Sequence, residues 1–118
     1  MKIKTFEDAC ASLNIPATLP DVSMLAEKDQ KPIIAAYKLF KIAEALNEGW
    51  LPDWSNYNQC KYYLWFNMDA AGFGFAYHSW SSGSTYTGVG SRLCFKKSRL
   101  AEYAGKQFEA IYKDLYTL

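Results

Sequence analysis

The 118-residue sequence has little of what metal sites and disulfide frameworks require. It contains one histidine and three cysteines, and Cys10, Cys60 and Cys94 stand far apart without a CxxC pair. A structural zinc site needs four clustered ligands, so we expect no metal and no cofactor. Free thiols are typical of a reducing compartment, which favours a cytoplasmic protein.

The sequence also lacks an excess of charge and any long apolar run. Its net charge is +1, whereas a protein dedicated to duplex DNA usually carries a clear basic excess. No segment approaches the about 18 apolar residues of a membrane-spanning helix, and the start MKIKTFEDAC has no signal-peptide core. We therefore expect a single domain over residues 1–118 that does not contact a membrane.

Catalytic signatures are missing as well. The sequence has no HExxH, GxSxG or kinase-like motif, and Gly88 and Gly90 precede a strand-like pattern instead of the helix of a phosphate-binding loop. The sole histidine, His78, would need a cysteine and an acid such as Asp69 beside it to support nucleophilic catalysis, and no spacing requires that arrangement. We expect a protein that is not an enzyme.

Helical patterns are present at both ends of the chain. Thr5 and Asp8 approximate a capping box for a helix over residues 5–13. Apolar residues spaced at i, i+3, i+4 and i+7 predict a helix over 28–48, followed by Gly49 as the C′ residue. Ser98 is expected to cap a final helix with one continuous apolar stripe that extends to Leu115.

The segment between the helices is rich in strand-forming residues. Strands are predicted at 60–66, 73–78 and 86–96, with Phe73, Phe75 and Tyr77 on one face of the second. The expected order is therefore α-α-β-β-β-α. This order predicts an α+β fold, in which a three-stranded antiparallel meander is covered by helices mainly on one face.

Aromatic residues make up 17% of the chain, more than one small core is expected to hold. Exposed rings on a sheet can anchor a protein interface or stack against unpaired bases. The residues predicted to form such an aromatic surface are Trp54, Tyr57, Tyr63, Trp65 and Trp80.

Basic residues gather where the last helix is expected to begin. Helix N-termini attract anions, and Arg92 is expected to share a strand face with Lys96. The candidate anion-binding residues are Arg92, Lys96, Lys97, Ser98 and Arg99. The alternative interpretation is a solvated basic turn with no ligand.

Several stretches, above all ALNEGW, PDW, GSRLCFK and LAEYAGKQF, resemble a family of small uncharacterised proteins encoded by gut bacteria and their phages. The resemblance covers most of the chain and implies a bacterial or phage-infected cytoplasm and a phage- or mobile-element-related role. It implies no activity. We therefore expect a domain that acts through a protein-interaction surface, with a protein partner or self-association. The alternative is a module that binds single-stranded nucleic acid or another anion through the exposed rings and the basic corner.

Overall fold

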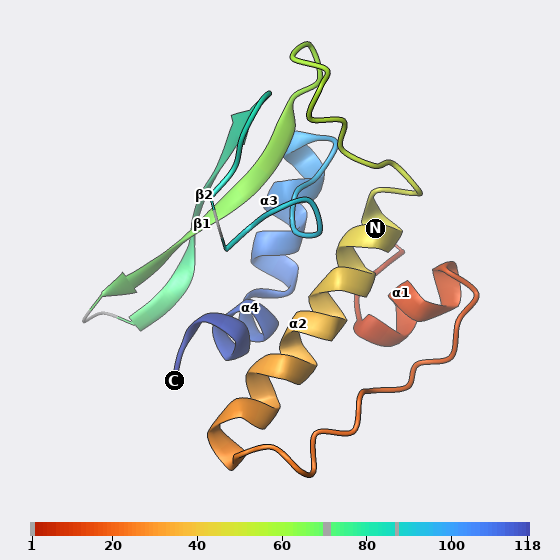
Figure 1. Cartoon of the computed structure of the whole chain (residues 1–118), viewed down its shortest axis with the longest axis vertical. Helices are drawn as coiled ribbons and strands as arrows, with labels where there is room; N and C mark the ends of the chain where they lie inside the picture. The colour runs from red at the N-terminus through yellow and green to blue at the C-terminus, as the bar shows by residue number, and fades with distance from the viewer. Residues whose placement is uncertain (1, 70–71, 87) are drawn as a thin grey trace.

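The computed structural model describes residues 2–69, 72–86 and 88–118. Figure 1 shows its helices on one side of a long antiparallel hairpin. The elements are α1 (Phe6–Ser12), α2 (Glu27–Leu46), β1 (Lys61–Asp69), β2 (Gly72–Ser81), α3 (Ser98–Gln107) and α4 (Glu109–Tyr116). The predicted α+β class is confirmed, but the order α-α-β-β-β-α and the three-stranded meander are wrong, because the described sheet has two strands.

The first two helices form where their local signals predict them. The Thr5 hydroxyl accepts the Asp8 N–H at 3.0 Å, and the Asp8 carboxylate accepts the Lys4 N–H at 3.0 Å. Together these bonds satisfy two backbone donors near the start of α1. The chain leaves α2 through the left-handed region at both Glu48 (φ 51°) and Gly49 (φ 84°). Since Asn47 is the C-cap, the C′ position expected for Gly49 belongs to Glu48.

The final helix is broken into two, which the continuous apolar stripe did not predict. Phe108 separates α3 from α4 with φ −110° and ψ 23°. Both Phe108 and Tyr112 are buried, so the break between the helices and α4 each contribute a large ring to the core. The N-cap of α3 is Lys97, and Ser98 is the first helical residue, so the predicted Ser98 cap is also wrong.

The predicted third strand at 86–96 is replaced by turns over residues 88–93 and one isolated bridge. In that bridge Tyr62 and Phe95 exchange two backbone hydrogen bonds of 2.9 and 2.7 Å. On either side of Phe95 the buried Asn47 amide takes the place of a strand, because it donates to the Cys94 carbonyl and accepts the Lys96 N–H, each at 3.0 Å. These side-chain bonds satisfy backbone groups that would otherwise need a sheet partner.

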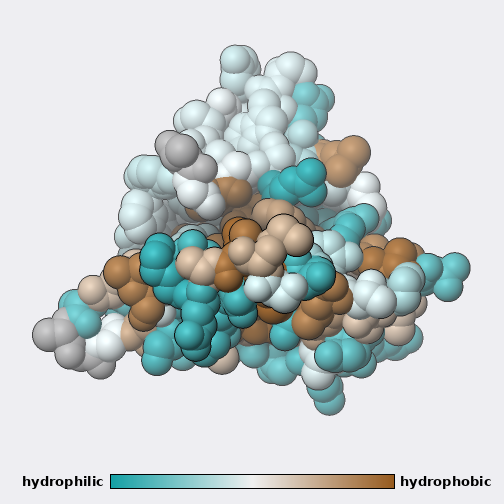
Figure 2. Space-filling model, turned by 60° about the horizontal axis from the view of Figure 1, so that its bottom comes forward, coloured by the Kyte–Doolittle hydropathy of each residue, from teal (hydrophilic) through white to brown (hydrophobic). Residues whose placement is uncertain are grey.

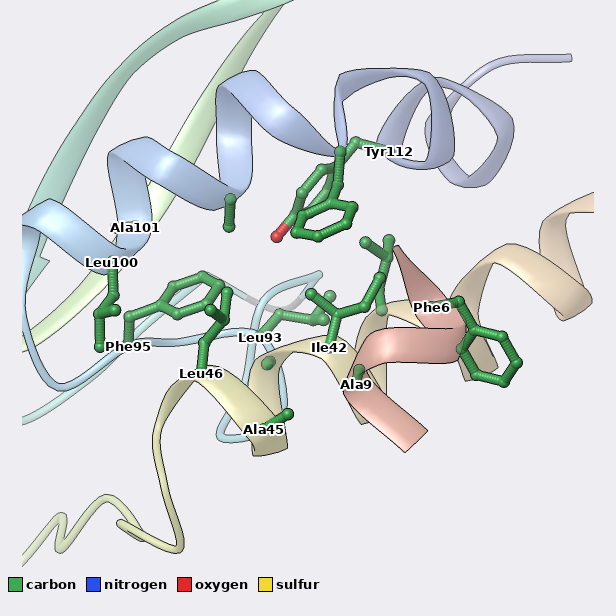
Figure 3. Packing of buried hydrophobic residues seen from close by; sticks show 14 of the residues in the cluster. Phe6, Ala9, Ile42, Ala45, Leu46, Leu93, Phe95, Leu100, Ala101 and Tyr112 are labelled. Carbon is green, nitrogen blue, oxygen red and sulfur yellow. The ribbon is translucent and has the colours of Figure 1, made fainter. Parts of the chain in front are cut away.

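The hydrophobic core lies between α2 and the α3–α4 pair. Figure 3 shows Ile42 and Leu46 of α2 beside Leu93 and Phe95, with Leu100 of α3 on the opposite side. Phe95 is fully buried, which explains why the apolar alternation of its segment serves the core and not a sheet face. The hairpin is left on the far side of α3 and α4, where only one of its faces meets the helices (Figure 1).

Exposed apolar side chains occur at the end of the molecule where α2 begins and the chain ends. They belong to the loop before α2, to α2 itself and to the C-terminus, and the largest exposures are those of Met24, Leu19, Ile33 and Leu118. Figure 2 shows this end, where the apolar residues form separate patches divided by hydrophilic ones. None of the helices in the described ranges is long and apolar enough to cross a membrane.

Candidate interaction surface

The inner face of the hairpin is packed against α3 and α4. The Phe66 ring centroid lies 4.7 Å from that of Tyr112 and 4.9 Å from that of Phe73. Gly105 of α3 lies directly under Phe75, since a Cβ at Gly105 would come within 2.4 Å of the Phe75 ring. The absence of a side chain at Gly105 therefore allows the helix and the strand to approach closely.

Two polar contacts also hold the hairpin to the helices. The Glu109 carboxylate accepts the Phe75 N–H at 2.8 Å, and Glu102 Oε1 lies 2.9 Å from His78 Nδ1. His78 also has its ring 6.0 Å from that of Tyr62, in an edge-to-face arrangement. The sole histidine is thus part of the contact between β2 and α3.

A β-bulge decides which rings of β2 face outward. Trp65 pairs with Tyr77 but Phe66 pairs with Phe75, so Ala76 is an extra residue in β2. A one-residue insertion reverses the alternation of side chains along the strand. The prediction that Phe73, Phe75 and Tyr77 share a face is therefore wrong, because Tyr77 points away from the helices while the two phenylalanines point toward them.

Four rings gather on the outer face, and we call them the outer ring cluster: Tyr63, Trp65, Tyr77 and Tyr86. Trp65 is at the centre, with its ring centroid 4.7 Å from Tyr86 and 6.0 Å from Tyr77. Tyr63 is buried beneath the cluster, whereas Tyr77 and Tyr86 are each 56% exposed. The cluster thus combines one buried ring, Tyr63, with two accessible tyrosines, Tyr77 and Tyr86.

The five residues of the predicted aromatic surface do not form one surface. Tyr63 and Trp65 belong to the outer ring cluster, but Trp80 pairs with Tyr62 and so lies on the inner side of the hairpin, 59% exposed. Tyr57 lies in the loop before β1, where its ring is 3.0 Å from the position a Cβ would take at Gly83. Sequence reasoning missed Tyr77, whose face depends on the bulge, and Tyr86, which follows the hairpin.

Trp54 has a different role from the one predicted, because it covers a buried lysine. Lys61 is fully buried, and its Nζ lies 5.1 Å from the Trp54 ring centroid. The same Nζ donates to the carbonyl oxygens of Asn56 (3.0 Å) and Ser82 (2.9 Å). Lysine is rarely buried without such partners, so Lys61 fastens the loops before β1 and after β2 to the hairpin.

The predicted anion-binding residues are spread over different environments. Arg92 is in the turn segment with its guanidinium 5.2 Å from the Phe40 ring centroid of α2, so the strand face it was expected to share with Lys96 does not exist. Lys96 uses its N–H to bind Asn47, while Lys97 and Arg99 are exposed at the start of α3. No side chain caps α3 at Ser98 or Lys97. Anion binding therefore remains a prediction only for the residues at the start of α3, Lys97, Ser98 and Arg99.

The two buried cysteines, Cys10 and Cys94, are poorly suited to nucleophilic chemistry. Burial raises the pKa of the Cys94 thiol to about 11, and burial followed by the charge of Glu7 raises the pKa of Cys10. A reactive cysteine requires a lowered pKa, so both shifts have the wrong sign. Within residues 2–69, 72–86 and 88–118, no group of three His, Cys, Asp or Glu side chains is placed to hold a metal ion.

Comparison of the chain with protein-family models, with curated proteins and with solved structures gives no match. The resemblance to proteins of gut bacteria and phages therefore stays an expectation, and the function has to be argued from the geometry of the surface alone.

Proposed function

We propose that this protein is a non-catalytic binding module that recognises another polypeptide through the outer ring cluster. The observation that supports this most directly is the pair of half-exposed tyrosines, Tyr77 and Tyr86, on the sheet face that the helices leave open. Tyrosine and tryptophan are enriched at protein interfaces because they offer large apolar area with few rotatable bonds and a polar tip. The family resemblance favours a phage- or mobile-element-related partner.

The charge distribution favours a protein partner over nucleic acid. Between Tyr62 and Met68, and between Gly72 and Ser81, the hairpin has no Asp, Glu, Lys or Arg, and its one histidine is His78. Affinity for a nucleic acid strand depends on Lys and Arg contacts to phosphates along the same track as the stacked bases. The exposed basic residues Lys97 and Arg99 instead lie at the start of α3, a helix that packs against the inner face.

The proposal is tested by placing a photo-crosslinking residue at Tyr77 in cells that express the protein. A reproducible adduct with a defined polypeptide is expected at Tyr77, and the Tyr86→Ser substitution should abolish it. Tyr57 is a matched control, because it is a 72% exposed tyrosine outside the cluster. Identical adducts at Tyr77 and Tyr57, or none at Tyr77, would count against the proposal.

A fluorescence titration tests the alternative that the outer ring cluster binds single-stranded nucleic acid. Trp65 is the central ring of the cluster, so a bound base would stack beside it and quench its emission. We expect no change when a mixed-sequence single-stranded oligonucleotide is added at low salt. A saturable, salt-sensitive quench that is lost in Tyr77→Ser would favour the alternative.

A further inference from the structure

The two edges of the hairpin differ in how their outward backbone groups are satisfied. At the β2 edge the bulge at Ala76 interrupts the regular strand, and the Glu109 carboxylate occupies the outward N–H of Phe75. At the β1 edge, Tyr62 is bonded from outside the hairpin through its two backbone hydrogen bonds to Phe95. Backbone groups that face one edge recur at every second residue of an antiparallel strand. The N–H and C=O groups of Leu64, Phe66 and Met68 therefore point to the same open edge as those of Tyr62.

This open edge lacks most of the features that normally prevent strand pairing, although the segment containing Gly88 and Val89 passes beside it. Natural edge strands are protected by charged residues, prolines, bulges or a covering segment. The stretch Tyr62–Met68 reads YYLWFNM and contains no charge, proline or glycine. Within the described ranges, no backbone hydrogen bond outside the hairpin reaches Leu64, Phe66 or Met68.

An apolar recess of about 170 Å³ lies beside the same edge. Its walls come from β1, from the segment after β2 and from the end of α4, and they include Leu64, Phe66, Val89, Gly88 and Tyr116. Met68 also borders the recess, and its own side chain is 61% exposed. The edge thus combines backbone groups that need partners with a hollow that accepts an apolar side chain.

We propose that the β1 edge binds the β1 edge of a second copy of this chain, so that two hairpins form one four-stranded antiparallel sheet. A two-fold axis through Phe66 pairs Phe66 with its equivalent and Leu64 with Met68 of the second copy. This register satisfies the outward N–H and C=O groups of all three residues in both copies, which is the self-complementarity that an isologous interface requires. It also brings the exposed Met68 side chain of each copy to the recess beside Leu64 of the other.

The contact between the two copies is small. The paired segment from Leu64 to Met68 is about 17 Å long at strand spacing. Such a contact is at the small end of specific interfaces, which predicts a reversible dimer that forms as concentration rises. The recess also borders Trp65 and Tyr86 of the outer ring cluster, so the two proposed surfaces adjoin. Tyr77 does not line the recess, so the Tyr77→Ser variant distinguishes the two proposals.

Sedimentation velocity from micromolar to millimolar concentration tests the dimer. The wild-type chain is expected to shift from monomer to dimer, and Met68→Pro is expected to stay monomeric, because proline removes an outward N–H without removing a bond to β2. Met68→Ala keeps the N–H and should still dimerise, and Tyr77→Ser should dimerise like the wild type. A wild-type chain that is monomeric throughout, or a dimer that persists unchanged in Met68→Pro, would overturn the proposal.

Amide hydrogen exchange on the wild-type chain gives a test that does not depend on how a variant folds. The amides of Leu64, Phe66 and Met68 should exchange at least several-fold more slowly at high concentration than at low concentration. The Phe73 amide on the β2 edge should be unaffected by concentration. Equal exchange of the β1 edge amides at both concentrations in a sample that dimerises would show that the interface lies elsewhere.

Discussion

The inner and outer faces of the hairpin both carry aromatic rings, but the rings are held in place by different contacts. Phe66, Phe73 and Phe75 on the inner face are packed against Tyr112, Tyr116 and Gly105 of the helices. Tyr77 and Tyr86 on the outer face contact other rings of the same cluster and remain half exposed. Aromatic rings thus serve stability on one face and are available for recognition on the other, and the aromatic content of the chain alone does not distinguish the two roles.

The difference between the faces predicts the largest effect in a pair of truncations. Phe66→Ala removes a ring that contacts four others, and we expect a loss of about 3 kcal/mol in the free energy of unfolding. Tyr77→Ser on the outer face should change it by no more than about 0.5 kcal/mol. Urea denaturation followed by circular dichroism measures both, and equal losses would show that the outer face is also structural.

The close approach of helix and strand gives a second contrast. Gly105→Ala inserts a methyl group into the Phe75 ring, so the ring or the helix has to move, at a cost of about 2 kcal/mol. Gly88→Ala is the matched control, because a Cβ there meets no atom within 4 Å. Thermal denaturation should show a clear drop in Tm for Gly105→Ala and little change for Gly88→Ala.

Lys61 tests whether the loops at the open end of the hairpin depend on a buried polar contact. Lys61→Met keeps the apolar volume but leaves the carbonyls of Asn56 and Ser82 without their donor, which is expected to cost about 1–3 kcal/mol. Lys97→Met, at an exposed position, serves as the control. Equal unfolding midpoints for the two variants in guanidinium chloride would mean that water replaces the Lys61 contacts.

A further effect is the loss of stability at alkaline pH. The folded-state pKa of Cys94, about 11, is above its ordinary value of 9.0, so the stability that burial gives is complete below pH 9 and falls as pH rises toward 11. Burial likewise raises the pKa of Tyr112 and Tyr116, which adds to the same decline at higher pH. In Cys94→Ala the free energy of unfolding should fall less steeply between pH 9 and pH 11 than in the wild type, as measured by denaturation between pH 8 and pH 11.

The rates at which the thiols react report on how deeply each cysteine is buried. Native-state labelling with a thiol reagent at pH 8 should modify Cys60, which is partly exposed, well before the buried Cys94. Mass spectrometry of the labelled peptides identifies the order. Labelling of Cys94 as fast as Cys60 would mean that the segment at 93–95 opens readily from the core.

The sequence by itself determined the features that depend on neighbouring residues. The Thr5–Asp8 cap, the helical spacing in α2 and the strand-forming runs of β1 and β2 act over a few positions, and each predicted element lies within a few residues of the observed one. The α+β class followed from them.

Only the tertiary structure decided the remaining features, because each depends on contacts or pairing between separate segments of the chain. Asn47 holds the backbone on both sides of Phe95, so an alternating segment became part of the core and the sheet kept an open edge. The bulge at Ala76 turned Tyr77 outward, and the carbonyls of Asn56 and Ser82 allowed Lys61 to be buried. A hydrogen-bond partner supplied from 20 or more residues away leaves no periodic signal in the sequence, although it decides which side chains reach the surface.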